Sequence, residues 1–169
     1  DALDSYSRQH PKTAPAKLSG KPHFAIPKKL EFFGDDQAKY AFQLALEQLK
    51  VLGVEMTEID FSTFEQLAAQ LYQGSWVAER TAAVAELLAQ QPEVFDPTVR
   101  EIIQKGHDFS AVDAYNAEYL KQDLSRKIQD TLAQFDALIV PTSPTIHTLA
   151  EMVQSPIGFN SQFGTYTNF

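Results

Sequence analysis

Hydrophobic positions near the start of the chain predict the order strand, helix, strand. Residues 23–26 form a short apolar run that a proline closes, as at the end of a buried strand. Apolar residues then recur at helical spacing over residues 36–52, with aspartates at 35 and 36 in the N-cap position and Gly53 after the last turn. Residues 54–61 have the pattern of a second strand. Such a unit predicts two parallel strands.

The middle of the chain is predicted to be helical. A helix is expected over residues 62–90, with Ser62 or Thr63 as its cap. Prolines interrupt the pattern before a short helix over residues 98–105. A long helix over residues 111–135 follows, with a serine in the cap position and apolar or aromatic side chains at helical spacing. Helices that alternate with strands are typical of a layered α/β fold.

The clearest strand signal lies over residues 136–141, where four apolar residues follow one another as in a buried parallel strand. The turn-rich segment PTSPT comes next, at the carboxyl end of this strand, where ligands bind in open α/β sheets. The pattern predicts an α/β fold with a mixed, mostly parallel sheet flanked by helices. We divide the chain into a linker at residues 1–22, an α/β part at 23–145, and a C-terminal segment at 146–169, in which little regular structure and some disorder are expected.

The helix predicted over residues 62–90 carries an arginine without a neighbouring acid. Tyr72, Trp76 and Arg80 are spaced four residues apart, so they share one face if the helix is continuous. The residues three and four positions from Arg80 include no carboxylate. Burial of an unpaired guanidinium costs free energy, so Arg80 needs a partner from elsewhere. Two partners are open: an Asp or Glu on another element, or a carboxylate or carbonyl of a small substrate.

Composition narrows the classes of partner. The chain has 169 residues, 44% of them hydrophobic and 21% charged, which is ordinary for a globular protein of one or two domains. Its net charge of −8 argues against nucleic acid and anionic membranes as partners. No apolar run is long enough to span a membrane, and the first residues lack the apolar core of a signal peptide. We therefore expect a cytoplasmic protein.

The residues themselves offer no catalytic machinery. The chain has no cysteine, and its four histidines are scattered without the spacing of a metal site. It has no glycine-rich phosphate loop and no nucleophile elbow. Ser143 is a hydroxyl without a companion base at a recognisable spacing. We therefore predict no metal, no cofactor and no catalytic residue in this chain.

Three segments of the chain resemble one family. DALDSYSR at residues 1–8, DALIVPTSPT at residues 136–145 and NSQFGTYTNF at residues 160–169 are similar to the amidase signature family, and within it to the allophanate hydrolases. The resemblance implies the latter part of an amidase signature fold. Members of this family use a Ser–cis-Ser–Lys triad, but the Gly/Ser-rich run that holds the serines does not occur here. The resemblance therefore implies a fragment, truncated after its C-terminal segment, that is inactive by itself.

The resemblance also implies roles for the stretch around Arg80. Tyr72 and Arg80 match two substrate-binding residues of allophanate hydrolases, with the same spacing and a similar context. Arg80 would hold the carboxylate of the substrate through charge-assisted hydrogen bonds, and Tyr72 would donate a hydrogen bond to the same molecule. Eight residues span roughly 12 Å along a helix. Gly74 and Ser75 permit a bend that shortens this gap.

Three further residues are candidates for the lining of the same pocket: Trp76, Thr142 and Ser143. Trp76 is more readily explained as a packing residue than as a ligand of the substrate. The PTSPT turn fits a structural role as well as a functional one. Tyr166 and Asn168 are expected to order the loop near the site.

The parent protein implied by the resemblance is an amide hydrolase that converts allophanate to ammonia and carbon dioxide in urea degradation. Its implied partners are a small carboxylated amide as substrate, a second copy in a homodimer, and a urea carboxylase to which the reaction is coupled. Two alternatives stay open. One is another amidase signature enzyme, such as a general amidase or a glutamyl-tRNA amidotransferase subunit. The other is a non-catalytic binding domain that uses the helix at residues 62–90 as its interface.

Overall fold

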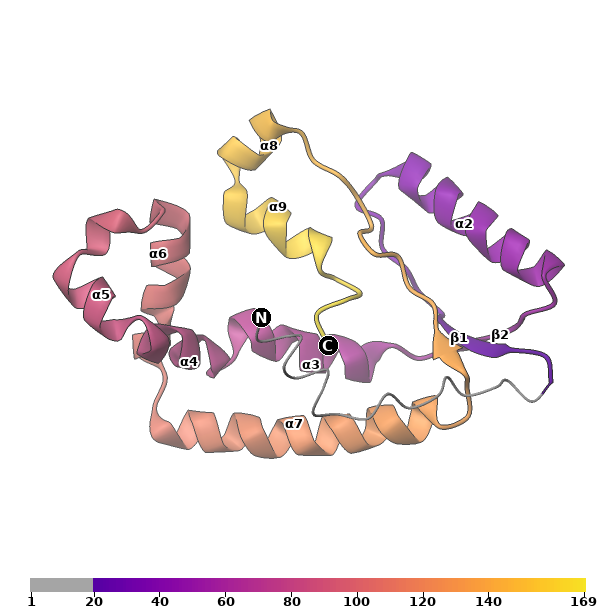
Figure 1. Cartoon of the computed structure of the whole chain (residues 1–169), viewed down its shortest axis with the longest axis horizontal. Helices are drawn as coiled ribbons and strands as arrows, with labels where there is room; N and C mark the ends of the chain where they lie inside the picture. Colours follow the sequence, from indigo (N-terminus) through magenta and orange to yellow (C-terminus); the bar gives the residue numbers. More distant parts are fainter. Residues whose placement is uncertain (1–19) are drawn as a thin grey trace, which may run out of the picture.

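Three parallel strands form the sheet of this computed structural model, which describes residues 20–169 (Figure 1). The central strand is β1 (His23–Pro27), and its neighbours are β2 (Glu55–Ile59) and β3 (Ala137–Leu138). Phe24 on β1 lies opposite Met56 on one side and Ala137 on the other. The predicted α/β fold with parallel strands and flanking helices is confirmed.

The crossover between β1 and β2 is α2 (Asp36–Val51). The carboxylate of Asp35 accepts a hydrogen bond from the Ala38 amide (2.9 Å), which satisfies a free donor of the first turn and lowers the pKa of Asp35. Gly53 has a φ of +87°, a left-handed conformation that glycine adopts without strain at the end of a helix. The predicted caps of this helix are confirmed, and its span agrees with the prediction to within one residue.

The segment predicted as one helix over residues 62–90 forms three helices, so that prediction is wrong. They are α3 (Ser62–Gln73), α4 (Trp76–Ala83) and α5 (Ala85–Gln90). The chain leaves the helical conformation at Gly74, which is extended (φ −100°, ψ 177°), and again at Val84. The expected hydroxyl cap is also absent, because the amide and the hydroxyl of Ser62 both donate to the carboxylate of Asp60.

The helices predicted over residues 98–105 and 111–135 are present. The elements of this region are η1 (Pro92–Val94), α6 (Pro97–Gln104), η2 (Lys105–Asp108) and α7 (Ala111–Leu132). Ser110 and Asp113 form a reciprocal capping box at the start of α7, which confirms the predicted serine cap. In Figure 1, α7 lies beneath α3 and α4, and the chain runs along it in the opposite direction, back toward the sheet. Within the described part of the chain, no helix is both long and apolar enough to cross a membrane.

The contact between α4 and η2 is so close that only glycine fits there. A β carbon on Gly106 would overlap the Thr81 hydroxyl and lie 2.8 Å from the Cα of Ala78. The Thr81 side chain is buried and hydrogen-bonds the carbonyls of Val77 (3.1 Å) and Ile103. These contacts fix the end of α4 against α6 and η2.

The core lies between the sheet, α3 and α7. Its buried members are Ala25, Ile59, Phe61, Phe64, Ile128 and Tyr166. The rings of Phe61 and Phe64 stack with centroids 4.7 Å apart. Tyr166 is 2% exposed, and its hydroxyl accepts a hydrogen bond from the Glu31 amide and contacts the Glu31 carbonyl (3.3 Å). The last residues of the chain therefore complete the core.

The last third of the chain differs from the prediction in two places, at β3 and in the segment that follows residue 145. β3 is shorter than the predicted strand over residues 136–141, although Asp136 and Ile139 also donate backbone hydrogen bonds to β1. Two helices, α8 (Leu149–Gln154) and α9 (Pro156–Phe163), occupy the segment in which little regular structure is expected, so that expectation is wrong. The division of the chain at residues 22 and 145 stays a prediction, and most of the first range lies outside the described residues.

We expect Gly106→Ala to lower the free energy of unfolding by about 1–3 kcal/mol, because the added methyl group overlaps Thr81 and the backbone of α4. Gly158→Ala is the matched control, since its β carbon would meet only the flexible side chain of Ser155 and alanine favours a helix. Chemical denaturation of both variants measures the difference. Equal stability of the two variants would contradict the close packing of α4 on η2.

Tyr166→Phe tests whether the end of the chain completes the core. Loss of the hydroxyl should lower the free energy of unfolding by about 1 kcal/mol at neutral pH. Burial raises the pKa of Tyr166 above 10.0, so the folded state favours the neutral phenol, and this stabilisation is lost as the pH rises through the pKa of the folded state. The wild-type chain should therefore lose more stability above pH 10 than the variant does. Tyr119→Phe, at an exposed position of α7, should change neither quantity.

Candidate functional site

The break between α3 and α4 brings Tyr72 and Arg80 into contact. The guanidinium carbon of Arg80 lies 4.9 Å from the centre of the Tyr72 ring, in a cation–π arrangement. In a continuous helix the two residues would be roughly 12 Å apart along the axis. The bend anticipated at Gly74 and Ser75 is therefore present as a complete interruption of the helix.

Both residues at the break have structural reasons to be there. A β carbon on Gly74 would lie 2.9 Å from the carbonyl oxygen of Gln70 and 2.6 Å from its side-chain oxygen, so a larger residue would push the turn apart. Ser75 is 5% exposed, and its hydroxyl donates to the carbonyl of Asp113 on α7 (3.3 Å). The start of α4 is thereby connected to the first turn of α7.

Arg80 does not lie on the apolar face of one continuous helix, so this part of the sequence interpretation is wrong. Its side chain is half-buried, and its guanidinium covers the face of Tyr72, which is itself 46% exposed. Among residues 20–169, no carboxylate lies within 4.0 Å of its nitrogen atoms. Of the two partners left open, the described residues supply no acid. As far as residues 20–169 are concerned, the hydrogen-bonding nitrogens of Arg80 are left for a ligand or for water.

Trp76 packs against α7. The ammonium of Lys121 lies 5.1 Å from the centre of its ring and 3.7 Å from the carboxylate of Glu118. Together with Arg80 and Ser75, these side chains line an open hollow of about 640 Å³ between α4 and α7. The contact with Lys121 agrees with the interpretation of Trp76 as a packing residue, and a role in substrate binding stays a prediction.

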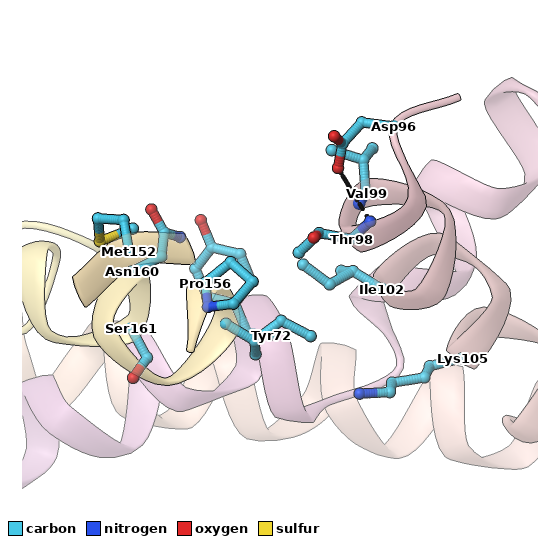
Figure 2. A pocket seen from close by; sticks show the side chains of 11 residues that line it. Tyr72, Asp96, Thr98, Val99, Ile102, Lys105, Met152, Pro156, Asn160 and Ser161 are labelled. Carbon is cyan, nitrogen blue, oxygen red and sulfur yellow. Dashed lines mark hydrogen bonds between the residues drawn. The ribbon is translucent and has the colours of Figure 1, made fainter. Parts of the chain in front are cut away.

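A second cavity, of about 420 Å³, has Tyr72 in its wall (Figure 2). Its walls come from the end of α3, from α6 with the start of η2, and from α8 and α9. They consist of Tyr72, Asp96, Thr98, Val99, Ile102, Lys105, Met152, Pro156, Ile157, Asn160 and Ser161. The side chain of Lys105 extends from η2 toward Tyr72 in this view. Asp96 is occupied at the start of α6, where it accepts hydrogen bonds from the amides of Thr98 and Val99.

Apart from Tyr72, the polar members of this cavity are absent from the sequence-based candidates. Lys105, Asn160 and Ser161 come from distant parts of the chain, and no spacing in the sequence links them to Tyr72. The sequence predicts a short helix over residues 98–105 and an irregular segment over 146–169, and neither prediction indicates that the two segments lie close together. Only the folded chain shows that α6 and α9 face each other across Tyr72.

Thr142 and Ser143 line neither of these two cavities. The Ser143 hydroxyl donates to the Thr145 carbonyl (2.7 Å), and the Thr145 hydroxyl donates to Asp35 at the start of α2 (3.3 Å). The PTSPT turn thus connects the end of β3 to α2. A role for Thr142 and Ser143 in the lining of the substrate pocket stays a prediction.

No group of His, Asp and Glu side chains in the described residues is arranged to hold a metal ion. His147 is held in a local cluster, with a ring nitrogen 2.7 Å from the Gln162 side-chain oxygen and its ring 4.3 Å from that of Phe159. It therefore joins the start of α8 to α9.

Comparison with known proteins decides the family. The Amidase family model matches residues 1–167. This chain belongs to the amidase family. The urea amidolyase of Saccharomyces cerevisiae is 38% identical over 168 residues, which are 98% of this chain and 9% of that protein, and the urea amidolyase of Lachancea kluyveri matches to the same extent. An amidase of Pseudomonas putida is 28% identical over 122 residues, which are 72% of this chain and 26% of that protein.

Solved structures show the same amidase fold. An allophanate hydrolase of Kluyveromyces lactis superimposes with a TM-score of 0.90 at 37% identity, over 99% of this chain and 28% of its own. The urea amidolyase of K. lactis superimposes with a TM-score of 0.85 at 38% identity, over 88% of this chain and 9% of its own. The present chain therefore spans about a quarter of the length of that hydrolase and about a tenth of the length of the urea amidolyases. The recognition of the amidase signature family from sequence motifs is confirmed.

Proposed function

We propose that this chain forms the substrate-binding part of an allophanate hydrolase. In the reaction, the C–N bond of the terminal amide of allophanate breaks, ammonia leaves, and the carbonyl carbon takes an oxygen atom from water. The product then decomposes to further ammonia and carbon dioxide. The catalytic triad of the family, two serines and a lysine, would come from another part of the parent enzyme. Tyr72 and Arg80 of this chain would hold the carboxylate end of the substrate.

The observation that carries this proposal is the Tyr72–Arg80 pair. The guanidinium is fixed over the ring of Tyr72, and no carboxylate of the described residues neutralises it. A planar guanidinium presents two parallel N–H groups, which match the two oxygens of a carboxylate. The hydroxyl of Tyr72, the ring on which the guanidinium stacks, would donate a third hydrogen bond.

Contact with the ring also prepares Arg80 for binding. An arginine side chain that is free in water loses rotamer freedom when it binds a ligand. Stacking on Tyr72 restricts this freedom before the substrate arrives, so less entropy is lost at binding. The half-buried setting further strengthens the attraction for a carboxylate, because fewer water molecules screen the charge.

The comparisons support allophanate over the substrates of the other family members. Identity to the urea amidolyases is higher, and extends over more of the chain, than identity to the Pseudomonas putida amidase. A general amidase also has no need of a cation for a substrate carboxylate. The proposal includes a cytoplasmic homodimer and coupling to a urea carboxylase, which would supply allophanate as its product.

Arg80→Leu in the enzyme that contains this chain should lower kcat/KM for allophanate by about 10- to 150-fold, the equivalent of about 1.5–3 kcal/mol for hydrogen bonds to a charged group. Most of the change should be a higher KM, because the carboxylate is bound in the ground state and in the transition state alike. Release of ammonia measures both constants.

The matched control for this experiment is Arg126→Leu. Arg126 is an exposed arginine of α7 that pairs with Asp123 (3.7 Å), so its removal should leave the kinetics within twofold. If Arg80→Leu has the same kinetics as the control, the pair does not bind the substrate, and another activity of the amidase family is favoured.

A further inference from the structure

We propose that Ser75 is a positioning residue for substrate recognition, because its hydrogen bond to α7 fixes the angle at which α4 carries Arg80 to Tyr72. The inference rests on the proposed function, since it assigns to Ser75 an effect on the affinity for the substrate carboxylate. Ser75 itself would not contact the substrate. Its effect would pass through the guanidinium of Arg80.

The position of Ser75 gives it control over this angle. It lies at the N-cap of α4, directly after the extended residue Gly74, where backbone torsions change the direction of the helix. Without a fixed point here, α4 could rotate relative to α3, because the helical hydrogen-bond ladder is interrupted. The backbone hydrogen bonds at Gly74, from its amide to the Gln70 carbonyl and from the Val77 amide to its carbonyl (both 3.3 Å), do not join a residue of α3 to a residue of α4.

The hydroxyl of Ser75 supplies such a fixed point. It is buried and donates to the carbonyl of Asp113, which is 38 residues further along the chain. That carbonyl is itself well placed, because Asp113 belongs to the capping box of α7. Its carboxylate accepts hydrogen bonds from the Ser110 hydroxyl (2.6 Å) and amide (2.8 Å), which also hold the pKa of Asp113 below its usual value. Ser75 is thereby hydrogen-bonded to the first turn of α7, which the capping box holds in place.

The other end of α4 is held independently. Thr81 hydrogen-bonds the Ile103 carbonyl and lies against Gly106, so α4 is fixed at both ends. Arg80 directly precedes Thr81, and Trp76 directly follows Ser75. A helix held at both ends has one orientation, and this orientation places the guanidinium 4.9 Å from the centre of the Tyr72 ring. Release of the Ser75 end would let α4 pivot about Thr81 and move Arg80 relative to Tyr72.

A direct catalytic role does not fit the geometry. Ser75 is 5% exposed, and its hydroxyl already donates a hydrogen bond to a backbone carbonyl. The described residues around it include no histidine or lysine within hydrogen-bond distance of the hydroxyl that could act as a base. The hydroxyl is therefore occupied in holding two helices together.

Ser75→Ala in the enzyme that contains this chain tests the inference. We expect KM for allophanate to rise about fivefold, the effect of one lost hydrogen bond, with kcat within twofold of wild type. Inhibition by malonamate, in which a methylene replaces the NH of allophanate, should weaken by a similar factor. Inhibition by malonamide, which has no carboxylate, should not change. A lower melting temperature without these changes would show a purely structural role and overturn the inference.

Two further variants make the result decisive. Ser75→Cys keeps a side chain of similar size and a weaker donor, so its KM should lie between those of wild type and Ser75→Ala, and it serves as the test if the alanine variant does not fold. Thr131→Ala removes an exposed hydroxyl that donates to a carbonyl of its own helix, α7, and should leave KM unchanged. An unchanged KM in both Ser75 variants overturns the inference. An unchanged KM in Arg80→Leu as well would instead overturn the proposed function.

Discussion

The interruption of the helix at Gly74 and Ser75 determines what the rest of the structure can bind. It turns two residues that a straight helix would separate by roughly 12 Å into a stacked pair. Glycine makes the interruption sterically possible, and the hydroxyl of serine holds it in one geometry against α7. Arg80 then lines the cavity that opens toward α7, and Tyr72 lines the cavity that opens toward α6 and α9. The chemistry of the surface around Tyr72 follows from this one local event.

The sheet and its core provide the frame for this arrangement. α3 is fixed through Phe64, which is 1% exposed and packs beneath the sheet with Phe61 and Tyr166. α7 is fixed through Ile128 in the same cluster. Because α3 and α7 are both anchored in one core, the hydrogen bond between Ser75 and Asp113 fixes the start of α4 to a frame that is already held. A deformation of the core would therefore reach Arg80 through the two helices.

Local signals made part of this fold predictable. The caps at Asp35, Gly53 and Ser110 depend on residues close to one another in sequence, and these three are present, whereas the cap predicted at Ser62 or Thr63 is not. The prediction of a single helix over residues 62–90 is wrong because an apolar periodicity of 3.6 continues through Gly74 and Val84 even where the helical hydrogen bonds do not. The prediction for residues 146–169 is wrong for the opposite reason: α8 and α9 are short and weakly periodic, and contacts such as that between His147 and Phe159 stabilise them.

The candidate site likewise contains residues that the sequence predicts and residues that it does not. Tyr72 and Arg80 could be singled out because they lie on one segment and match a family pattern, although their contact depends on a break that periodicity does not reveal. Lys105 and Asn160 could not be found, since their only relation to Tyr72 is spatial. The hydrogen bond from Ser75 to Asp113 is likewise invisible in the sequence, where 38 residues separate the two. Long-range contacts of this kind carry the geometry on which binding depends.

The most direct test of the account is a crystal structure of the enzyme that contains this chain, with malonamate bound. The account predicts that the carboxylate of malonamate lies within hydrogen-bond distance of the Arg80 guanidinium and of the Tyr72 hydroxyl, with α4 in the orientation that Ser75 fixes. A carboxylate bound elsewhere, with Arg80 still stacked on Tyr72 and in contact only with water, would contradict the assignment of this pair as the carboxylate site.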